Sequence, residues 1–340
     1  MSSEAAGDPD AEDPVAYFLE DITYQGKTER TQAAYRRVLR DFEAYLEGRG
    51  LEPAAANHRD CMAYVHELRG SVAESTVATY ASSLHRFYDY MVRAGRFEDN
   101  PMALVLEEID ESINTDPTRR DISVPEMRRF VDGVAHPLAR AAIVTLLKTG
   151  MRAGELCNLD TRDLHLPDEP ATTAPRPRLQ GRPRSLYVDS APAQGAVYNG
   201  ERRQASNKRK RATTVPVDDE LARVLRRWLA VRPDPVSEAD PLFLSTSEWG
   251  RRLTPDMVHH TVAEYARDAG WYREGGGPEE NVTPHYFRHF FTTHLRDRTG
   301  DRGVVKDLRG DVAQDVIDTY THDWGDRVRT VYEANIYSIL

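Results

Sequence analysis

The sequence has little cysteine and no long apolar run. Its 340 residues include two cysteines, Cys61 and Cys157, which are too few for a disulfide framework or a cysteine-based zinc site and are typical of a reducing compartment. The longest apolar stretch, around residues 141–147, is far shorter than the roughly 18 residues of a membrane span. Residues 1–15 are acidic and small and lack the apolar segment of a secretory signal. These absences predict a cytoplasmic protein.

Positive charge is in deficit overall but is concentrated locally. The formal net charge is −10, although lysine and arginine usually provide most of the affinity for a phosphate backbone. Residues 201–211 reverse this balance, because they read ERRQASNKRKR and hold six cations against one anion. Lysine is scarce and arginine abundant, which fits either a salt-adapted source or a high-GC genome. An acidic protein with one basic face for nucleic acid is compatible with both.

The first half of the chain predicts a helical domain. Residues 1–13 are expected to be a disordered acidic leader and residues 14–105 a bundle of helices. Apolar side chains recur at helical spacing at positions 35, 39, 42 and 46, and again at 77, 80, 84, 87 and 91. Ser75 is placed to cap the second of these helices, and Pro101 is expected to end the block. Residues 106–120 lack periodicity and predict a linker.

A second domain is predicted over residues 121–340, mainly helical with a small β-sheet. Ser123 and Glu126 have the spacing of a capping box, so a helix is expected to start there. The helix that follows, at 137–149, is expected to end at Gly150 and to deliver the next residues just past its terminus. Residues 185–188 and 212–217 are rich in strand formers. Further helices are predicted to start after three capping residues, Asp218, Thr254 and Thr283.

Five chemically active residues are scattered along this second domain in a particular order. Arg152 lies in Thr-Gly-Met-Arg-Ala-Gly-Glu-Leu, and Lys208 stands eight residues before the proline of a Val-Pro pair. His285 and Arg288 form His-x-x-Arg-His, and Tyr320 lies in Asp-Thr-Tyr-Thr-His. Each element alone is weak evidence, since arginines near helix ends and helical histidines are common. The joint order is much more specific.

Together these residues could transfer a phosphodiester without a metal ion. The negative charge on the non-bridging oxygens needs fixed positive donors, and Arg152 and Arg288 are planar, always charged and able to bind two oxygens at once. Tyr320 is a poor nucleophile at the ordinary tyrosine pKa of about 10, but neighbouring cations favour its phenolate. His285 can accept its proton, and Lys208 can protonate the departing sugar oxygen.

In this order and spacing the sequence resembles the tyrosine recombinases, the integrase and Xer-like family, over roughly its last 200 residues. The resemblance implies a helical SAM-like core-binding domain followed by an α/β catalytic domain. It implies a 3′-phosphotyrosyl link at Tyr320, with no metal, no cofactor and no ATP. The implied partners are double-stranded DNA carrying a specific site and further copies of the chain, which would form a tetramer holding two duplexes.

The resemblance also implies that the helical domain contacts one side of the duplex. The polar faces of its helices and the basic run at 201–211 are the candidate contact surfaces. The DNA-binding residues expected there are Arg36, Arg40, Thr76, Thr79, Arg86, Arg202, Arg203, Arg209, Lys210 and Arg211.

One residue departs from the family pattern. Where the family usually carries His or Trp beside a glycine, nine residues before the nucleophile, this chain has Asp311. A carboxylate beside the scissile phosphate would repel it, so Asp311 either points away, orients His285 or an arginine, or marks a weakened enzyme. The segment between Arg152 and Lys208 is also unusually long, which leaves Lys208 and Lys210 as alternative general acids.

Two other functions use the same residues. A DNA-binding relative without catalysis would keep the fold, and Asp311 is its only support. A type IB topoisomerase-like enzyme would use the same phosphotyrosine chemistry to relax supercoils. Retention of the five other active groups argues against the DNA-binding relative, and the extended tail after Tyr320 favours a recombinase over the topoisomerase.

The end of the chain predicts a terminal helix. Asp326 is placed to cap it, and apolar residues follow at positions 328, 331, 332, 336 and 339. This apolar stripe either folds back onto its own catalytic domain or docks into a neighbouring protomer, and the family's tetramers favour docking. Tyr332 and Tyr337 lie here and compete with Tyr320 as candidate nucleophiles.

Overall fold

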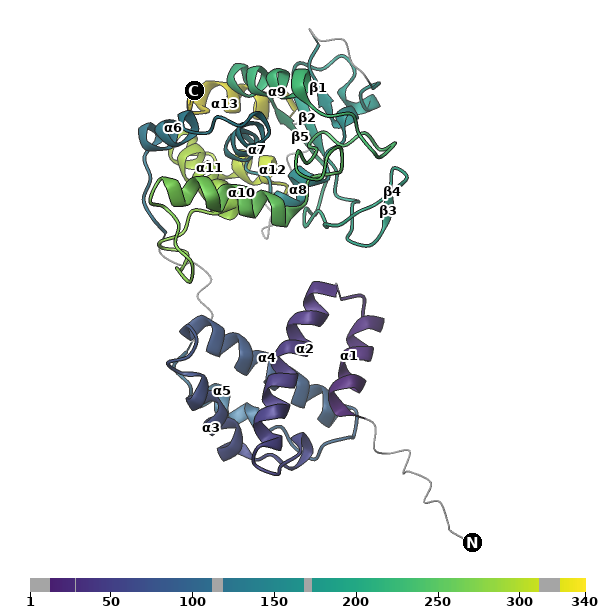
Figure 1. The fold of residues 1–340 in the computed structure, drawn as a ribbon, viewed down its shortest axis with the longest axis vertical. Coiled ribbons are helices and arrows are strands. Elements are labelled where there is room, and N and C mark those ends of the chain that lie inside the picture. Colours follow the sequence, from purple (N-terminus) through teal and green to yellow (C-terminus); the bar gives the residue numbers. More distant parts are fainter. Residues whose placement is uncertain (1–12, 28, 112–118, 168–172, 312–324) are drawn as a thin grey trace. The chain divides into compact units, whose positions relative to one another are not determined.

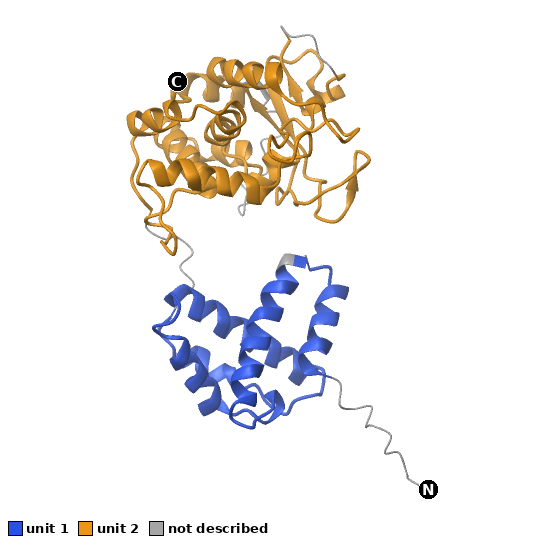
Figure 2. Ribbon diagram, viewed as in Figure 1, with its two compact units in different colours: residues 1–117 blue, residues 118–340 orange. Residues whose placement is uncertain are grey.

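The computed structural model describes residues 13–27, 29–111, 119–167, 173–311 and 325–340. The chain divides into two compact units, residues 1–117 and 118–340 (Figure 2). The predicted leader up to residue 12, residues 112–118 of the predicted linker and Tyr320 lie outside the described residues.

Unit 1 is a helical bundle. Its apolar stripes form the core as predicted, with Leu39, Phe42 and Leu46 buried from one helix and Leu84 and Phe87 from another. Its α-helices are α1 (Pro14–Tyr24), α2 (Glu29–Glu47), α3 (His58–Leu68), α4 (Glu74–Arg93) and α5 (Met102–Glu108).

Two boundaries in unit 1 differ from the predictions. Helix α4 starts after Ala73, so Ser75 lies inside the first turn and is not its cap. Pro101 does not end the helical block, because it stands at the start of α5, which crosses into the predicted linker. Met102 and Val105 are buried against the bundle. Burial of these two apolar side chains stabilises a short helix here, although the sequence has no longer periodic pattern.

Unit 2 is mainly helical with a small sheet, the fold class that the sequence predicts. Its helices are α6 (Val124–Asp132), α7 (Pro137–Thr149), α8 (Ala153–Cys157), α9 (Asp219–Val231), α10 (Pro255–Asp268), α11 (Pro284–Thr299), α12 (Arg302–Arg309) and α13 (Gly325–Asn335). Its strands are β1 (Leu164–His165), β2 (Ser185–Val188), β3 (Val197–Tyr198), β4 (Glu201–Arg202) and β5 (Thr213–Pro216). None of the helices in the described ranges is long and apolar enough to span a membrane.

The starts of these elements follow local sequence signals. Ser123 and Glu126 form the predicted capping box of α6, and Asp218 and Thr254 accept backbone N–H bonds at the starts of α9 and α10. The two predicted strands, β2 and β5, pair antiparallel with Leu186 opposite Val215, and β1, which was not predicted, adds to β2 to give the order β1-β2-β5. A separate hairpin, β3-β4, lies in the long segment between Arg152 and β5.

Helix α7 runs through the middle of unit 2, with α9, α10 and α11 around it (Figure 1). Every residue from Ala141 to Thr149 is buried. The helix ends at Gly150, whose φ of 63° is in the left-handed region. A Cβ at Gly150 would lie 2.3 Å from the ring of Phe291 on α11, so only glycine allows both this turn and the close packing of α11.

The terminal segment folds back onto its own unit, contrary to the predicted docking into a neighbour. The helix starts at Gly325 and ends at Asn335, and the last residues are irregular. Tyr332, Tyr337 and Ile339 are fully buried in the unit 2 core. The two tyrosines are held by the last turn of α7, where backbone carbonyls lack helical partners, and the Ile339 N–H donates to Glu220 at the start of α9.

Polar contacts fix this segment. The Tyr332 hydroxyl donates to the carbonyl of Lys148 at 2.9 Å, and the Tyr337 hydroxyl donates to the carbonyl of Leu147. The buried Lys148 ammonium donates to the Tyr337 carbonyl at 2.6 Å and pairs with Asp218 at 2.7 Å. The apolar stripe therefore packs against the core of its own unit.

Candidate active site

Arg152 stands where α7 gives way to α8. Its own N–H donates to Glu155 Oε2 at 2.9 Å, and its Nη1 donates to Glu155 Oε1 at 3.1 Å. Glu155 is fully buried, so the carboxylate is a fixed support for a guanidinium that stays partly open to solvent. The short turn from Gly150 thus projects Arg152 away from the core.

Arg288 reaches the same place from α11. It is almost completely buried, and its Nη1 donates to the carbonyl of Gly150 at 2.7 Å. This bond connects Arg288 to the turn that carries Arg152, although the two residues are far apart in sequence. The structure therefore brings the two predicted phosphate-binding arginines together.

Asp311 lies among the arginines. Its two carboxylate oxygens accept from Arg288 Nη2 at 3.0 and 3.2 Å. Arg309 Nε lies 2.8 Å from Asp311 Oδ2, and Arg152 Nη2 lies 3.5 Å from Oδ1. Of the alternatives that the sequence leaves open, the structure excludes a carboxylate that points away from the site.

His285 lies one turn before Arg288 on α11 and keeps an exposed face. Partial burial of the imidazole lowers its pKa below the ordinary value of 6.5, and the nearby charges of Arg119, Arg288, Arg152 and Arg309 lower this pKa further. His285 is therefore neutral at pH 7 and able to accept a proton.

Two arginines of this site were missed by sequence reasoning. Arg309 directly precedes the Gly-Asp pair, so its place beside Asp311 was readable from the sequence. Arg119 lies at the end of the predicted linker, and no motif or spacing connects it with His285. Its Nε is buried without a partner in the part of the chain that the structure describes.

The basic run at 201–211 alternates between inward and outward side chains. Arg203 and Arg209 are buried, whereas Arg202, Lys208 and Lys210 are exposed. The predictions that Arg203 and Arg209 bind DNA are therefore wrong. Both guanidinium groups face buried carboxylates inside the unit, and the sequence does not reveal where those carboxylates lie.

Arg209 is buried beneath the active-site arginines and contacts the residues that hold them. Its Nη2 lies 3.2 Å from Glu155 Oε2, and its Nη1 donates to the carbonyl of Leu308 at 3.1 Å. Its side chain passes over Gly310, which has a φ of 68°, and a Cβ there would lie 2.4 Å from Arg209 Cγ. Glycine at position 310 is thus required by both the backbone and the neighbouring arginine.

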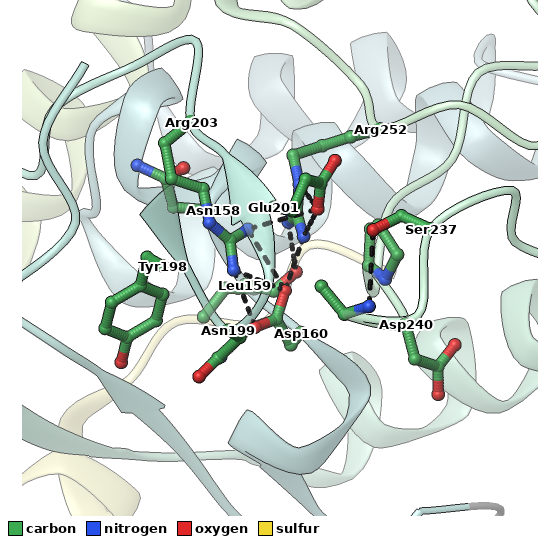
Figure 3. A network of polar contacts seen from close by, with 12 residues as sticks. Asn158, Leu159, Asp160, Tyr198, Asn199, Glu201, Arg203, Ser237, Asp240 and Arg252 are labelled. Carbon is green, nitrogen blue, oxygen red and sulfur yellow. Dashed lines mark hydrogen bonds and ion pairs between the residues drawn. The ribbon is translucent and has the colours of Figure 1, made fainter. Parts of the chain in front are cut away.

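Arg203 belongs to a second, separate cluster (Figure 3). Its guanidinium forms hydrogen bonds of 2.9 and 3.2 Å with Asp160, which also accepts from Arg252 Nη2 at 2.6 Å. Arg252 in turn donates to Glu201 at 2.5 and 2.9 Å. These bonds attach the β3-β4 hairpin to the body of unit 2.

Lys208 and Lys210 both lie on an irregular segment before β5 and not on a strand. The backbone N–H of Lys210 donates to the carbonyl of Gly310 at 3.4 Å. The segment therefore runs beside the residue next to Asp311, with both lysine side chains directed to solvent. This geometry keeps both lysines as candidates for the general acid.

The remaining predicted DNA-binding residues are at the surface, but several have protein partners. Arg40 pairs with Asp13 and Glu43, and Arg211 pairs with Asp307. Further contacts are those of the Arg86 guanidinium over the Tyr35 ring, of the Thr79 hydroxyl with the Ser75 carbonyl, and of Arg202 with the Gly195 carbonyl. Arg36 is exposed and Thr76 is half-buried.

Neither metal ligation nor a disulfide is indicated in the described ranges. No group of three or more His, Cys, Asp and Glu side chains is arranged there to hold a metal ion. Cys61 and Cys157 are both buried and unpaired.

Comparisons with known proteins agree with this architecture. Residues 125–325 match the phage integrase family, and residues 15–95 match the N-terminal SAM-like domain of phage integrases. The tyrosine recombinase XerD of Shewanella oneidensis is 24% identical over 326 residues, which cover 94% of each sequence. The tyrosine recombinase XerC of Chromohalobacter salexigens is 28% identical over 311 residues, which cover 86% of each.

Solved structures share the fold. The Tn1549 transposon integrase in complex with a circular intermediate DNA aligns with a TM-score of 0.64 and 19% identity, over 94% of this chain and 98% of that one. A lambda integrase tetramer bound to a Holliday junction aligns with a TM-score of 0.63 and 14% identity, over 91% and 78%. The chain therefore belongs to the phage integrase family of tyrosine site-specific recombinases.

Proposed function

We propose that the protein cuts and rejoins double-stranded DNA at a specific site through a covalent 3′-phosphotyrosyl link to Tyr320, without metal or ATP. The observation that carries this proposal is the convergence of Arg152, Arg288 and Arg309 on one anion, the Asp311 carboxylate. Guanidinium groups that surround one carboxylate are equally suited to the oxygens of a phosphodiester.

Each residue has a distinct role in the proposed reaction. The Tyr320 oxygen attacks phosphorus, the bond to the 5′-oxygen breaks, and the arginines stabilise the charge that develops on the non-bridging oxygens. Neutral His285 accepts the phenol proton, which its lowered pKa permits at neutral pH. Lys208 gives a proton to the departing 5′-oxygen. Rejoining is the reverse, with a 5′-hydroxyl from the partner strand attacking the phosphotyrosyl bond.

Glu155 and Arg209 are positioning residues in this proposal. Arg209 fills the space behind Gly310 and holds one oxygen of Glu155, which in turn holds Arg152. The buried pair of Glu155 and Arg209 therefore fixes the Arg152 guanidinium, which contacts the phosphate, but the pair itself does not touch the DNA.

The relatives suggest the assembly. The lambda integrase structure is a tetramer on a Holliday junction, and we propose a tetramer holding two duplexes for this chain as well. Exposed Arg36, Arg86 and Arg202 are the predicted contacts with the DNA backbone. The proposal places the protein in the cytoplasm, where two unpaired cysteines are stable.

Replacement of the nucleophile tests this proposal. On a nicked suicide substrate, in which the cut strand is lost, the Tyr320→Phe variant should form no covalent adduct while its affinity for DNA stays nearly unchanged. Tyr332 and Tyr337 are fully buried and donate to α7 carbonyls, so Tyr332→Phe should retain the adduct. Adduct formation by Tyr320→Phe would refute the assignment.

A modified substrate distinguishes Lys208 from Lys210. A 5′-bridging phosphorothiolate leaves as a low-pKa thiolate and needs no general acid, so cleavage of this substrate should be almost normal in Lys208→Ala. Lys210→Ala is the matched control, because both side chains are exposed on the same segment. Rescue of Lys210→Ala alone would reverse the two assignments.

A further inference from the structure

Asp311 occupies the centre of the three-arginine site formed by Arg152, Arg288 and Arg309. The three guanidinium groups come from separate places, namely the turn before α8, the second turn of α11 and the last residue of α12. Their nitrogens lie 2.8 to 3.5 Å from the two carboxylate oxygens. A single anion is thus bound from several directions, as an enzyme binds a phosphate.

We propose that the Asp311 carboxylate is an internal anion that occupies the position of the DNA phosphate, and that it leaves the three-arginine site when the phosphate binds. Arg309 then becomes a third phosphate-binding residue beside Arg152 and Arg288. The identification of the ligand as a DNA phosphate rests on the proposed function above, whereas the competition between two anions does not.

The surroundings of Asp311 allow such a movement. About 30% of its side chain is exposed, and it follows Gly310, where the chain turns in the left-handed region. Its backbone N–H donates to the carbonyl of Lys306 at 3.1 Å, so the backbone stays attached to α12 while the side chain turns outward. Glu155, the other carboxylate beside Arg152, is fully buried between two arginines and has no such path.

Electrostatics explain why an internal anion is useful. Burial, together with the like charges of Arg309 and Arg152, lowers the pKa of Arg288, and the charges of Glu155 and Asp311 oppose this effect. The carboxylate therefore stabilises the assembled cations before DNA arrives. A phosphodiester carries the same single negative charge, so the exchange leaves the charge of the site unchanged and makes binding of isolated anions weak.

Binding of inorganic sulfate to the full-length protein tests this inference without any cleavage. The Asp311→Asn variant removes the competing charge at nearly constant volume, and its affinity for sulfate in calorimetric titration should rise at least about tenfold. The control Asp297→Asn removes an exposed carboxylate that pairs with Arg296 on the same helix as Arg288, and it should change the affinity less than twofold.

A second substitution shows which site binds the sulfate. Arg309→Gln introduced into Asp311→Asn should lower the gained affinity by on the order of tenfold, because a third cation is lost. If Asp311→Asn fails to fold, Asp311→Ser offers the same removal of charge with a smaller side chain.

The outcomes separate this inference from the proposed function. Unchanged or weaker sulfate binding in a folded Asp311→Asn or Asp311→Ser protein would overturn it, because Asp311 would then support the arginines and not compete for them. Tighter sulfate binding by Asp311→Asn, combined with no covalent adduct in the wild-type protein, would keep this inference and reject the proposed nucleophile. The two failures therefore have different signatures.

Discussion

Two arginine–carboxylate clusters of unit 2, around Asp160 and around Asp311, have opposite properties. Around Asp160, the side chains of Arg203 and Arg252 are at most 7% exposed, and Glu201 completes a balanced set of two cations and two anions. Around Asp311, three arginines share one partly exposed carboxylate. The Asp160 cluster is balanced in charge and closed to solvent, so its role is structural. The Asp311 cluster has excess positive charge and is open to solvent, so it is suited to bind an anion.

The largest expected effect on cleavage concerns the Asp311 cluster. Arg152→Ala removes a guanidinium that contacts the phosphate in the proposed reaction, so single-turnover cleavage should fall on the order of 10²-fold or more. Stability should change little, because Glu155 keeps its ion pair with Arg209. Cleavage within tenfold of the wild-type rate would contradict the difference between the two clusters.

A substitution in the Asp160 cluster should instead lower stability and leave cleavage unchanged. Arg203→Ala leaves the buried Asp160 with Arg252 as its remaining cation, and the free energy of unfolding should fall by about 3 kcal/mol. Denaturant titration measures this loss, and the folded fraction should cleave DNA at the wild-type rate. The exposed neighbour Arg202→Ala is the control and should stay within about 0.5 kcal/mol. A cleavage defect in folded Arg203→Ala would remove the distinction.

A smaller effect concerns the pH dependence of cleavage. The pKa of His285 is lowered, so its neutral form persists below pH 6.5, and the rate should fall only as the pH drops through this lowered pKa. Arg309→Gln removes one of the nearby cations, and the midpoint of the acid limb should therefore move upward. Arg296→Gln, farther along α11, is the control. A wild-type midpoint at or above 6.5 would contradict the lowered pKa of His285.

Local signals predicted much of this fold. The capping box at Ser123, the glycine end of α7 and the strands that became β2 and β5 depend on a few adjacent residues. Arg152 and Arg288 were recognised because their motifs combine chemistry with helix ends. Such signals are contained within short segments of the chain.

Features that depend on distant partners were not predictable. Arg203 and Arg209 lie in the same basic run as the exposed cations, and only the positions of Asp160 and Glu155 decide that they turn inward. The charge of Arg119 lowers the pKa of His285, although no motif connects the two residues. For the terminal stripe the sequence favoured docking into a neighbour, but carbonyl groups at the end of α7, which no sequence pattern reveals, hold it within its own unit.

Peptide mapping of the covalent adduct tests the central claim most directly. The wild-type protein is trapped on a nicked suicide substrate, treated with nuclease and trypsin, and analysed by mass spectrometry. We expect the residual nucleotide on Tyr320, within the peptide of residues 310–327 that lies between Arg309 and Val328. A nucleotide on Tyr332 or Tyr337, in the peptide of residues 330–340, or the absence of any adduct in a DNA-binding protein, would contradict the account.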